Sequence, residues 1–268
     1  MKIPPPLIGT DELSRRLNEV VICDIRWSLS DPSHGVAAYE EGHIPGAVFV
    51  DLDHDLAGEP GPGRHPLPEP GAFLDTLGQL GIDRQTEVVV YDDAEGMIAA
   101  RMWWMLRSIG HRQVRLLDGG YNVWVGEGRQ IETGHNQPTP VSYRGPASFS
   151  GVAQREDLEG RTLIDLRSAA RYAGLEEPVD PKAGHIPGAV SRPAEGNLAP
   201  DGRFQTPATL SRLYREIGSD AVVYCGSGVT ACHGAVAMVL AGRDMPDVYV
   251  GSFSEWSRLD LPVATGDS

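Results

Sequence analysis

Cys225 is the residue of this sequence best suited to act as a nucleophile, because it stands where an apolar run ends and a glycine-containing loop begins. It lies in the segment AVVYCGSGVTAC, residues 221–232. The valines predict a short buried strand, and the mostly apolar residues 229–242 predict a helix after the loop. Gly226 and Gly228 permit backbone angles that other residues resist. The pattern therefore predicts a cysteine held by a loop between a strand and a helix.

The main-chain amides of such a loop are expected to converge on the cysteine sulfur. Together with the positive end of the following helix, they stabilise a thiolate or an anion bound to it. Substrate binding is therefore predicted for four residues of the loop, namely Gly226, Gly228, Val229 and Thr230. A buried structural cysteine is the alternative, because cysteines are among the residues most often found in protein interiors.

The composition limits the partners that the protein can have. The chain of 268 residues carries 37 acidic and 23 basic residues, for a formal net charge of −14. A surface of this sign repels phosphate backbones and anionic lipids, which argues against nucleic-acid and membrane partners. An anionic substrate would have to be attracted locally, by a few arginines and by amide dipoles near the loop. The length suffices for two ordinary domains or for one large barrel or sandwich.

The cysteines and glycines argue against several other kinds of site. The chain has three cysteines, too few for a disulfide framework, and Cys225 and Cys232 lack the spacing of redox or zinc sites. A reducing cytoplasm is therefore the expected compartment. No stretch has the apolar length of a signal peptide or a membrane span. The loop glycines lack the spacing of phosphate-binding fingerprints, so neither a cofactor nor a metal is predicted.

The sequence repeats itself at long range. EGHIPGAV at residues 41–48 returns as AGHIPGAV at residues 183–190, with seven of eight positions identical. DIR at residues 24–26 returns as DLR at residues 165–167. A repeat of this length indicates duplicated domains rather than a solenoid.

Two pairs of repeated residues are assigned structural roles. His43 and His185 occur in both copies although only one copy carries the reactive cysteine, so we expect them to brace a turn rather than to catalyse. Arg26 and Arg167 are likewise expected to form ion pairs that hold the end of a strand.

Each copy alternates short apolar runs with helical segments, which predicts α/β domains with mainly parallel sheets flanked by helices. The predicted strands cover residues 20–25, 87–91, 114–117, 162–166, 221–224 and 248–250. Residues 133–146, rich in proline, glycine and small polar residues, are the predicted linker. We therefore predict two tandem domains, residues 1–132 and 147–268, with the nucleophile in the second.

The loop of the first copy that corresponds to the cysteine loop has a different residue at the key position. Alignment of the equivalent strands places Asp92 opposite Cys225 and Gly96 opposite Gly228, which makes the first loop one residue longer. A carboxylate cannot carry sulfur as a persulfide. The first copy is therefore predicted to be a scaffold that keeps the fold without the chemistry.

These motifs together resemble a known family. The tandem HIPGAV motifs, the CGSGVTAC loop in the second copy alone and the LDGG segment followed by a tryptophan make the chain resemble a two-domain rhodanese-type sulfurtransferase over nearly its whole length. The loop is similar to that of the 3-mercaptopyruvate branch. Thiosulfate-preferring members instead carry bulky basic residues after the cysteine, where this chain has Gly226 and Ser227. The resemblance implies that Cys225 takes a sulfane sulfur from the donor and stores it as a persulfide. It then passes the sulfur to cyanide or to a thiol such as thioredoxin or a small thiol.

The same resemblance implies a proton relay beside the cysteine, matched here by Ser227, His65 and Asp53. A hydroxyl oriented by an imidazole, itself oriented by a carboxylate, can relay a proton from the donor thiol. The active site would then lie at the interface between the two halves. From the residues alone, His65 could equally be a solvated loop histidine, and the neighbouring Asp51 and Asp55 leave open which carboxylate acts.

The resemblance also assigns an anion-binding arginine. Arg171 matches the arginine that family members use to bind the donor, and a guanidinium fork suits a carboxylate. The mercaptopyruvate branch uses a second arginine shortly before the second histidine motif. Residues 177–182 contain none, and Lys182 is the candidate substitute. This departure leaves the donor preference open.

Three other functions are weighed against this one. Cysteine phosphatases close their anion-binding loop with an arginine six positions after the cysteine, where this chain has Ala231, so a phosphatase is disfavoured. A thiosulfate sulfurtransferase and a non-catalytic persulfide carrier or sensor remain alternatives. The presence of both Ser227 and His65 favours turnover over simple carriage of sulfur.

Overall fold

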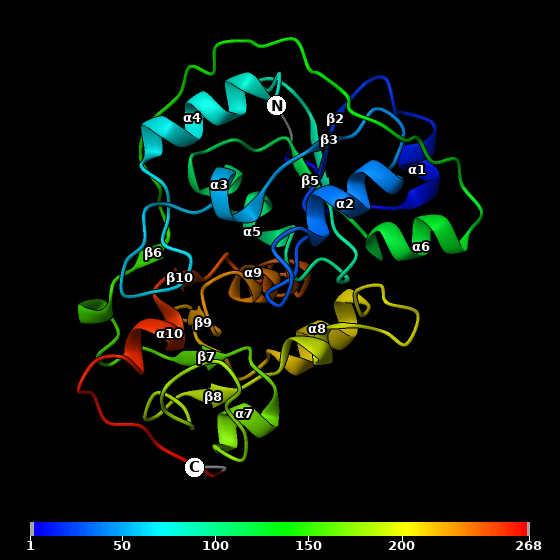
Figure 1. Ribbon diagram of the computed structural model, residues 1–268. Coiled ribbons are helices and arrows are strands. Elements are labelled where there is room, and N and C mark those ends of the chain that lie inside the picture. The colour runs from blue at the N-terminus through cyan, green and yellow to red at the C-terminus, as the bar shows by residue number, and fades with distance from the viewer. Residues whose placement is uncertain (1–2, 267–268) are drawn as a thin grey trace. The chain divides into compact units, whose positions relative to one another are not determined.

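The computed structural model describes residues 3–266, which fall into two compact units (Figure 1). Unit 1 comprises residues 3–58, 67–150 and 200–203, and unit 2 comprises residues 59–66, 151–199 and 204–266. The short segments 59–66 and 200–203 thus each belong to the unit built mainly from the other half of the sequence.

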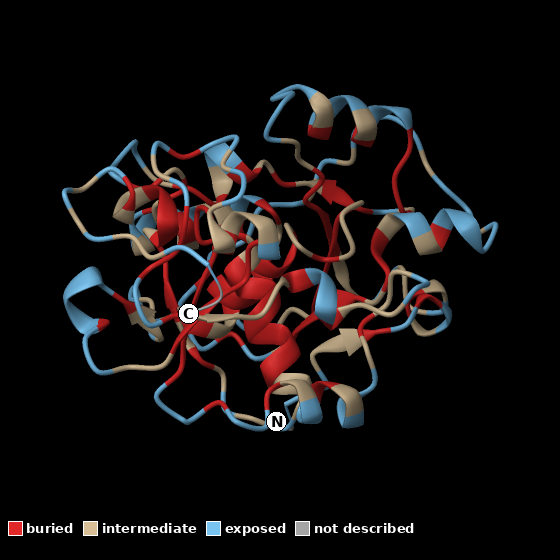
Figure 2. Cartoon of the chain, turned by 90° about the horizontal axis from the view of Figure 1, so that it is seen from below, coloured by how far each residue is buried: buried red, intermediate tan, exposed pale blue. Residues whose placement is uncertain are grey.

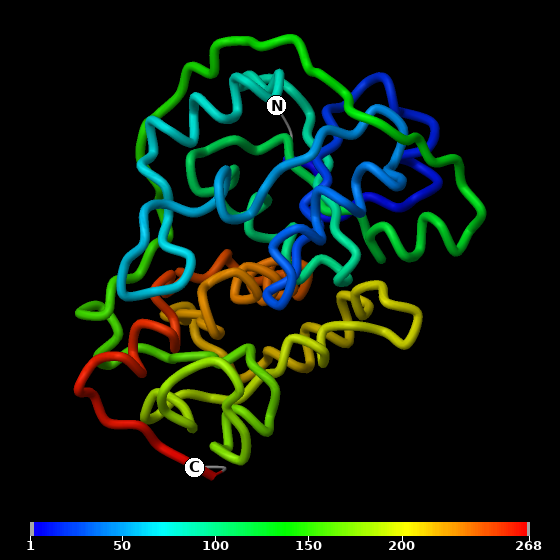
Figure 3. Tube along the Cα trace, viewed as in Figure 1, coloured from blue at the N-terminus to red at the C-terminus, as the bar shows by residue number. Residues whose placement is uncertain are grey.

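Residues 133–146, the predicted linker, belong to unit 1. The trace in Figure 3 follows this segment in green past helix α4, where the Val141 amide donates to the Gly78 carbonyl at 2.9 Å. The ring of Tyr143 is buried. The division into residues 1–132 and 147–268 stays a prediction. Residues 1–2 and 267–268 lie outside the described part of the chain.

Unit 1 is built on a five-stranded sheet in the order β1-β5-β4-β2-β3, with every neighbouring pair parallel. Its strands are β1 (Leu7–Ile8), β2 (Val21–Asp24), β3 (Val48–Phe49), β4 (Val88–Tyr91) and β5 (Val114–Leu117). Its helices are α1 (Thr10–Ser14), α2 (His34–Glu41), α3 (Leu52–Asp55), α4 (Pro70–Gln79), α5 (Ala100–Ser108) and α6 (Gly120–Gly126). The central strand β4 reads VVVY and is buried throughout, as expected for a parallel strand covered on both faces.

Unit 2 repeats this plan in the order β6-β10-β9-β7-β8, again with every pair parallel. Its strands are β6 (Val152–Ala153), β7 (Leu163–Asp165), β8 (Val190–Ser191), β9 (Val222–Tyr224) and β10 (Asp247–Tyr249). Its helices are α7 (Ala169–Ala173), α8 (Pro207–Leu213), α9 (Thr230–Leu240) and α10 (Ser252–Trp256), with two 3-10 turns, η1 (Arg155–Asp157) and η2 (Ala194–Asn197).

Helix α9 forms the interior of unit 2 next to the central strand β9. It is apolar on nearly all sides, and most of its residues are buried, including the run from Ala231 to Met238. A helix without a polar face is stable only when it is enclosed on all sides. In Figure 2 buried residues gather in the interior, and exposed ones lie mostly along peripheral loops and outer helix faces. The helix that follows the cysteine loop is therefore buried along most of its length.

The predicted fold class is confirmed, and all six predicted strands occur within a residue or so of their predicted bounds. Four further strands, β1, β3, β6 and β8, were not predicted. Each has two residues and lies at the edge of its sheet. A run this short carries no readable alternation, so only its pairing in the folded sheet defines it.

The repeated histidines brace turns, as predicted. His43 Nδ1 lies 2.8 Å from the Tyr39 carbonyl, and its ring stacks on Tyr39 with centroids 4.0 Å apart. His185 has the same two contacts with Tyr172, at 2.8 Å and 3.7 Å. Both histidines are completely buried. Equal geometry in the two units indicates a structural role.

The repeated arginines form the predicted ion pairs at strand ends. Arg26 binds the Asp24 carboxylate through Nε and Nη2 and also donates to the Gly42 carbonyl. Arg167 makes the same contacts with Asp165 and the Gly184 carbonyl. Each guanidinium thus ties the carboxyl end of β2 or β7 to the loop of the histidine motif.

In unit 1 the loop after β4 encloses the carboxylate of Asp92. Its Oδ1 accepts hydrogen bonds from the amides of Ala94 and Gly96, and its Oδ2 from those of Ile98 and Ala99, at 2.7–2.9 Å. Burial raises the pKa of this carboxyl, and the four amide hydrogen bonds oppose that shift. The loop after β4 therefore surrounds a carboxylate with main-chain amides.

Replacing Asp92 by Asn should destabilise unit 1, because the amide has one acceptor oxygen and its NH2 group would face two amide donors. A buried donor without an acceptor costs about 1–3 kcal/mol, so we expect the free energy of unfolding to fall by about 2–6 kcal/mol. Urea unfolding followed by tryptophan fluorescence measures this, since Trp103, Trp104 and Trp124 are buried in this unit. Asp75→Asn, at an exposed position of α4, is the matched control. Equal stability of the two variants would contradict this role of Asp92.

Candidate active site

Cys225 follows the central strand β9 directly, and helix α10 fixes its backbone. The Cys225 carbonyl accepts from the Phe253 amide at 3.0 Å, and the Gly226 carbonyl accepts from the Ser254 amide at 2.8 Å. The Cys225 amide donates to Ser252 Oγ at 3.2 Å. The side chain is buried, with 3% of its surface exposed. The carbonyls of Cys225 and Gly226 are thus both held by main-chain amides of α10.

The amides after Cys225 are available for an anion. Among residues 3–266, no acceptor takes the amides of four loop residues, Gly226, Ser227, Val229 and Thr230. Thr230 begins α9, whose 11 residues add the positive end of a helix dipole. In unit 1 the equivalent loop places its amides on the Asp92 carboxylate. The loop of unit 2 can surround an anionic sulfur or a bound anion in the same way.

Gly228 is required by the conformation of this loop. Its φ is +78°, and a Cβ added there would lie 2.5 Å from the Val250 carbonyl oxygen. Both the left-handed backbone and the close approach to Val250 exclude a side chain. Cys232, one turn into α9, donates its thiol hydrogen to the Gly228 carbonyl at 3.3 Å, which is consistent with a packing role.

Ser227 and His65, 162 positions apart in the sequence, are hydrogen-bonded. Ser227 Oγ lies 2.8 Å from His65 Nδ1, and 8% and 6% of the two residues are exposed. His65 is therefore buried rather than a solvated loop histidine. The pair can pass a proton between the hydroxyl and the ring.

Residues 59–66, which carry His65, belong to unit 2 because they dock on α10. The Arg64 amide donates to Ser254 Oγ at 3.1 Å, and Arg258 Nη1 donates to the Pro62 carbonyl at 2.8 Å. Gly63 lies against Gly251, so that a Cβ at position 63 would be 3.1 Å from the Gly251 Cα. This docking fixes the imidazole at Ser227.

Asp53, the third member of the predicted relay, lies in unit 1 at the start of α3. Its Oδ2 accepts from Trp27 Nε1 at 2.8 Å. The neighbouring carboxylates are engaged locally: Asp51 caps the helix by accepting from the amides of Asp53 and His54, and Asp55 accepts from the Asp51 amide. The role of Asp53 in orienting His65 stays a prediction.

Arg171 lies beside the cysteine loop in a network of ions. It binds Glu177 through Nε and Nη2, and Nη2 also lies 3.1 Å from Asp180. Burial is the largest single influence on Glu177 and raises its pKa, but the hydrogen bond and charge of Arg171 and the amides of Asp180 and Val179 together outweigh it, so the net direction is downward. Lys182, the candidate second cation, donates its ammonium hydrogens to the carbonyls of Leu259 and Leu261. That ammonium is therefore engaged by the C-terminal segment.

Arg64 was not predicted as a site residue. Its Nη1 forms an ion pair with Asp180, which also contacts Arg171. A Cβ built on Gly226 would lie 2.7 Å from Arg64 Nη2 and 3.5 Å from Arg171 Nη1. The available sequence signal was its position next to His65, which the resemblance connected to the cysteine loop, but no residue pattern assigned Arg64 itself to the site.

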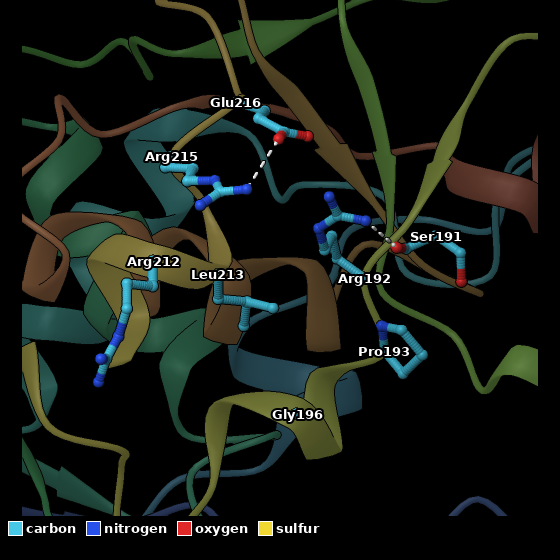
Figure 4. Close-up of a pocket in the computed structure, with 8 residues that line it drawn as sticks. All are labelled: Ser191, Arg192, Pro193, Gly196, Arg212, Leu213, Arg215 and Glu216. Atoms are coloured by element: carbon cyan, nitrogen blue, oxygen red, sulfur yellow. Dashed lines mark hydrogen bonds and ion pairs between the residues drawn. The ribbon is translucent and has the colours of Figure 1, made fainter. Parts of the chain in front are cut away.

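Other candidate features lie outside this cluster. A cavity of about 380 Å³ in unit 2 contains none of the predicted site residues. It is lined by Ser191, Arg192, Pro193, Gly196, Arg212, Leu213, Arg215 and Glu216 (Figure 4). Within residues 3–266, no group of His, Cys, Asp and Glu side chains is arranged to hold a metal ion. No helix in that range has the length and apolar character needed to cross a membrane.

Comparison with known proteins identifies similar chains. The model of the rhodanese-like domain matches residues 9–127 and 151–259. A probable 3-mercaptopyruvate sulfurtransferase of Pseudomonas aeruginosa is 40% identical, over 97% of this chain and 98% of that protein. A putative thiosulfate sulfurtransferase of Mycobacterium tuberculosis is 42% identical, over 89% and 88%. The solved structure of a 3-mercaptopyruvate sulfurtransferase from Leishmania major matches with a TM-score of 0.88 at 28% identity, over 97% of this chain and 76% of that one.

Replacing Gly228 by Ala should displace the amides around Cys225, because the methyl group would meet the Val250 carbonyl. We expect the alkylation rate of Cys225 by iodoacetamide at neutral pH to fall at least about tenfold, since loss of about 1.4 kcal/mol of anion stabilisation has this effect. Mass spectrometry of the modified peptide gives the rate. Gly242→Ala is the matched control, because Gly242 has a φ of +79° and nothing within 4 Å of the added Cβ. Equal alkylation rates in the two variants would contradict this account of the loop.

Proposed function

Because this chain belongs to the rhodanese-like family, we propose that it is a sulfurtransferase that takes sulfur from 3-mercaptopyruvate and passes it to a thiol or to cyanide, through a persulfide on Cys225. One observation carries this proposal. The buried Cys225 begins a loop in which the amides of Gly226, Ser227, Val229 and Thr230 lack acceptors among the described residues, and Ser227 of this loop is hydrogen-bonded to His65. The sulfurtransferase names of the relatives agree with it.

In the first half-reaction, the Cys225 thiolate attacks the sulfur of the donor. A sulfur–sulfur bond forms, the carbon–sulfur bond breaks, and its electron pair moves onto carbon to give the enolate of pyruvate. The donor thiol proton must leave sulfur, and the enolate carbon must gain a proton. Ser227 and His65 supply a path for this transfer, because the hydroxyl can exchange a proton with the imidazole across 2.8 Å. The loop amides stabilise the negative charge while sulfur moves.

In the second half-reaction, a thiolate or cyanide attacks the outer sulfur of the persulfide. The sulfur–sulfur bond breaks, and its electron pair returns to Cys225 as thiolate. The product is a persulfide of the acceptor thiol, or thiocyanate. A small thiol and thioredoxin are the thiol acceptors we propose. All three cysteines of the chain are free thiols, which agrees with a reducing compartment, and we propose the cytoplasm.

Thiosulfate is the second candidate donor, because the Mycobacterium tuberculosis relative carries that name. The local chemistry favours mercaptopyruvate. Gly226 and Ser227 follow the cysteine, and the hydroxyl of Ser227 is bound to His65. A proton relay is useful only for a donor that has a thiol proton to lose, and thiosulfate has none.

Replacing Cys225 by Ser should abolish release of pyruvate from 3-mercaptopyruvate in the presence of 2-mercaptoethanol. Mass spectrometry of the wild-type protein after exposure to the donor, without acceptor, should find one added sulfur atom on the peptide of Cys225. Cys23→Ala, in strand β2 of unit 1, is the control and should retain turnover. If the wild type released no pyruvate and did not use thiosulfate, a persulfide carrier would replace the enzyme as the better description.

Replacing Ser227 by Ala should separate the two donors. The substitution removes the hydroxyl of the relay, so we expect kcat for 3-mercaptopyruvate to fall by about 10²–10⁴, the usual range for general acid–base catalysis. Turnover of thiosulfate to thiocyanate with cyanide should fall much less. The ratio of the two steady-state rates in one preparation is the measurement. Equal losses with the two donors would reject the relay.

A further inference from the structure

Two guanidinium groups of unit 2 converge on one point next to the nucleophile. That point is the Cβ position of Gly226, 2.7 Å from Arg64 Nη2 and 3.5 Å from Arg171 Nη1. Because residue 226 has no side chain, both guanidinium groups can lie against its backbone. They therefore meet at the residue that follows Cys225.

The two nitrogens nearest Gly226, Arg64 Nη2 and Arg171 Nη1, have hydrogens that are not used in hydrogen bonds within the described part of the chain. Arg171 uses Nε and Nη2 for Glu177 and Asp180, and Arg64 uses Nη1 for Asp180. Arg64 Nε is buried without a partner, and within residues 3–266 no acceptor takes Arg64 Nη2 or Arg171 Nη1. Buried arginine donors normally find acceptors. Arg64 and Arg171 therefore each keep a donor without an acceptor next to Gly226.

Asp180 explains how two guanidinium groups can lie close together. Its carboxylate is fully buried and touches both arginines, whose side chains are 16% and 18% exposed. Asp180 and Glu177 together balance the charges of the two guanidinium groups. The attraction for an anion therefore comes from the guanidinium donors directed at Gly226, in a protein whose net charge of −14 would otherwise repel it.

We propose that Arg64 is a donor-binding residue that determines specificity, and that together with Arg171 it binds the charged group of the sulfur donor at Gly226. The carboxylate of 3-mercaptopyruvate is three bonds from its sulfur, and a fork of guanidinium donors suits it. The sulfonate oxygens of thiosulfate can use the same donors. The identity of the donor rests on the proposed function, whereas the location of the anion site does not.

The test measures KM and kcat of Arg64→Gln with 3-mercaptopyruvate and 2-mercaptoethanol. We expect KM for the donor to rise at least about tenfold, as for loss of a charge-assisted hydrogen bond, with kcat changed less than about threefold. The KM for the acceptor should not change. Arg64→Lys should restore part of the loss, because it keeps the charge without the fork.

Arg258→Gln is the matched control. Arg258 holds the same segment by donating to the carbonyls of Pro62 and Ser254, but it is not among the nearest atoms to Gly226. If Arg64 only docks the segment, Arg258→Gln should raise the donor KM equally. That result, or a donor KM of Arg64→Gln within about twofold of wild type, would overturn the proposal.

A second measurement is independent of turnover. Cys225 is alkylated in parallel with anionic iodoacetate and neutral iodoacetamide, and the ratio of the two rates is compared between wild type and Arg64→Gln. We expect the ratio to fall at least about fivefold, since one nearby charge is removed. An unchanged ratio would overturn the anion site even in an active enzyme. If the wild type showed no turnover but the iodoacetate-to-iodoacetamide ratio still fell in Arg64→Gln, the proposed function would be rejected. The anion-binding role of Arg64 would be supported.

Discussion

The structure depends on the hydrogen bonding of main-chain amides in the loop that follows the central strand of each sheet. In unit 1 this loop directs four amides at the buried carboxylate of Asp92. In unit 2 the equivalent loop begins at Cys225, and among the described residues no acceptor takes the amides of Gly226, Ser227, Val229 and Thr230. The same backbone device thus encloses a carboxylate in one copy and is available to an anionic sulfur in the other. The two loops differ in the residue that follows the strand, Asp92 or Cys225, and in one residue of length.

The loop can keep its shape because everything around it is fixed. Strand β9 lies in the middle of a parallel sheet, α9 is enclosed, and α10 binds the carbonyls of Cys225 and Gly226. Gly228 approaches the Val250 carbonyl too closely for any side chain. Amides held in this way need no reorganisation when charge develops on sulfur, and such preorganised dipoles account for much of the rate enhancement in many enzymes.

Electrostatics divides the arginines of unit 2 into two groups. Arg167 is saturated by Asp165, Glu177 and the Gly184 carbonyl, and its counterpart Arg26 makes the equivalent ion pair in unit 1. Arg64 and Arg171 share Asp180 and keep donors directed at Gly226. The first group holds strand ends in place, whereas the second group keeps donors next to Cys225 that could bind an anion.

The sequence alone determined the features that depend on local order. Apolar runs marked the buried strands, the repeated histidine motif revealed the duplication, and a glycine-flanked cysteine predicted the nucleophile. Two-residue edge strands escaped prediction because pairing, not composition, defines them. Only the tertiary structure decided that His65 is buried on Ser227, that Lys182 is held by the C-terminal segment, and that Arg64 reaches Gly226. These contacts join residues far apart in the chain. Those of His65 and Arg64 depend on where residues 59–66 dock, and that of Lys182 depends on the path of residues 259–261, which no local pattern encodes.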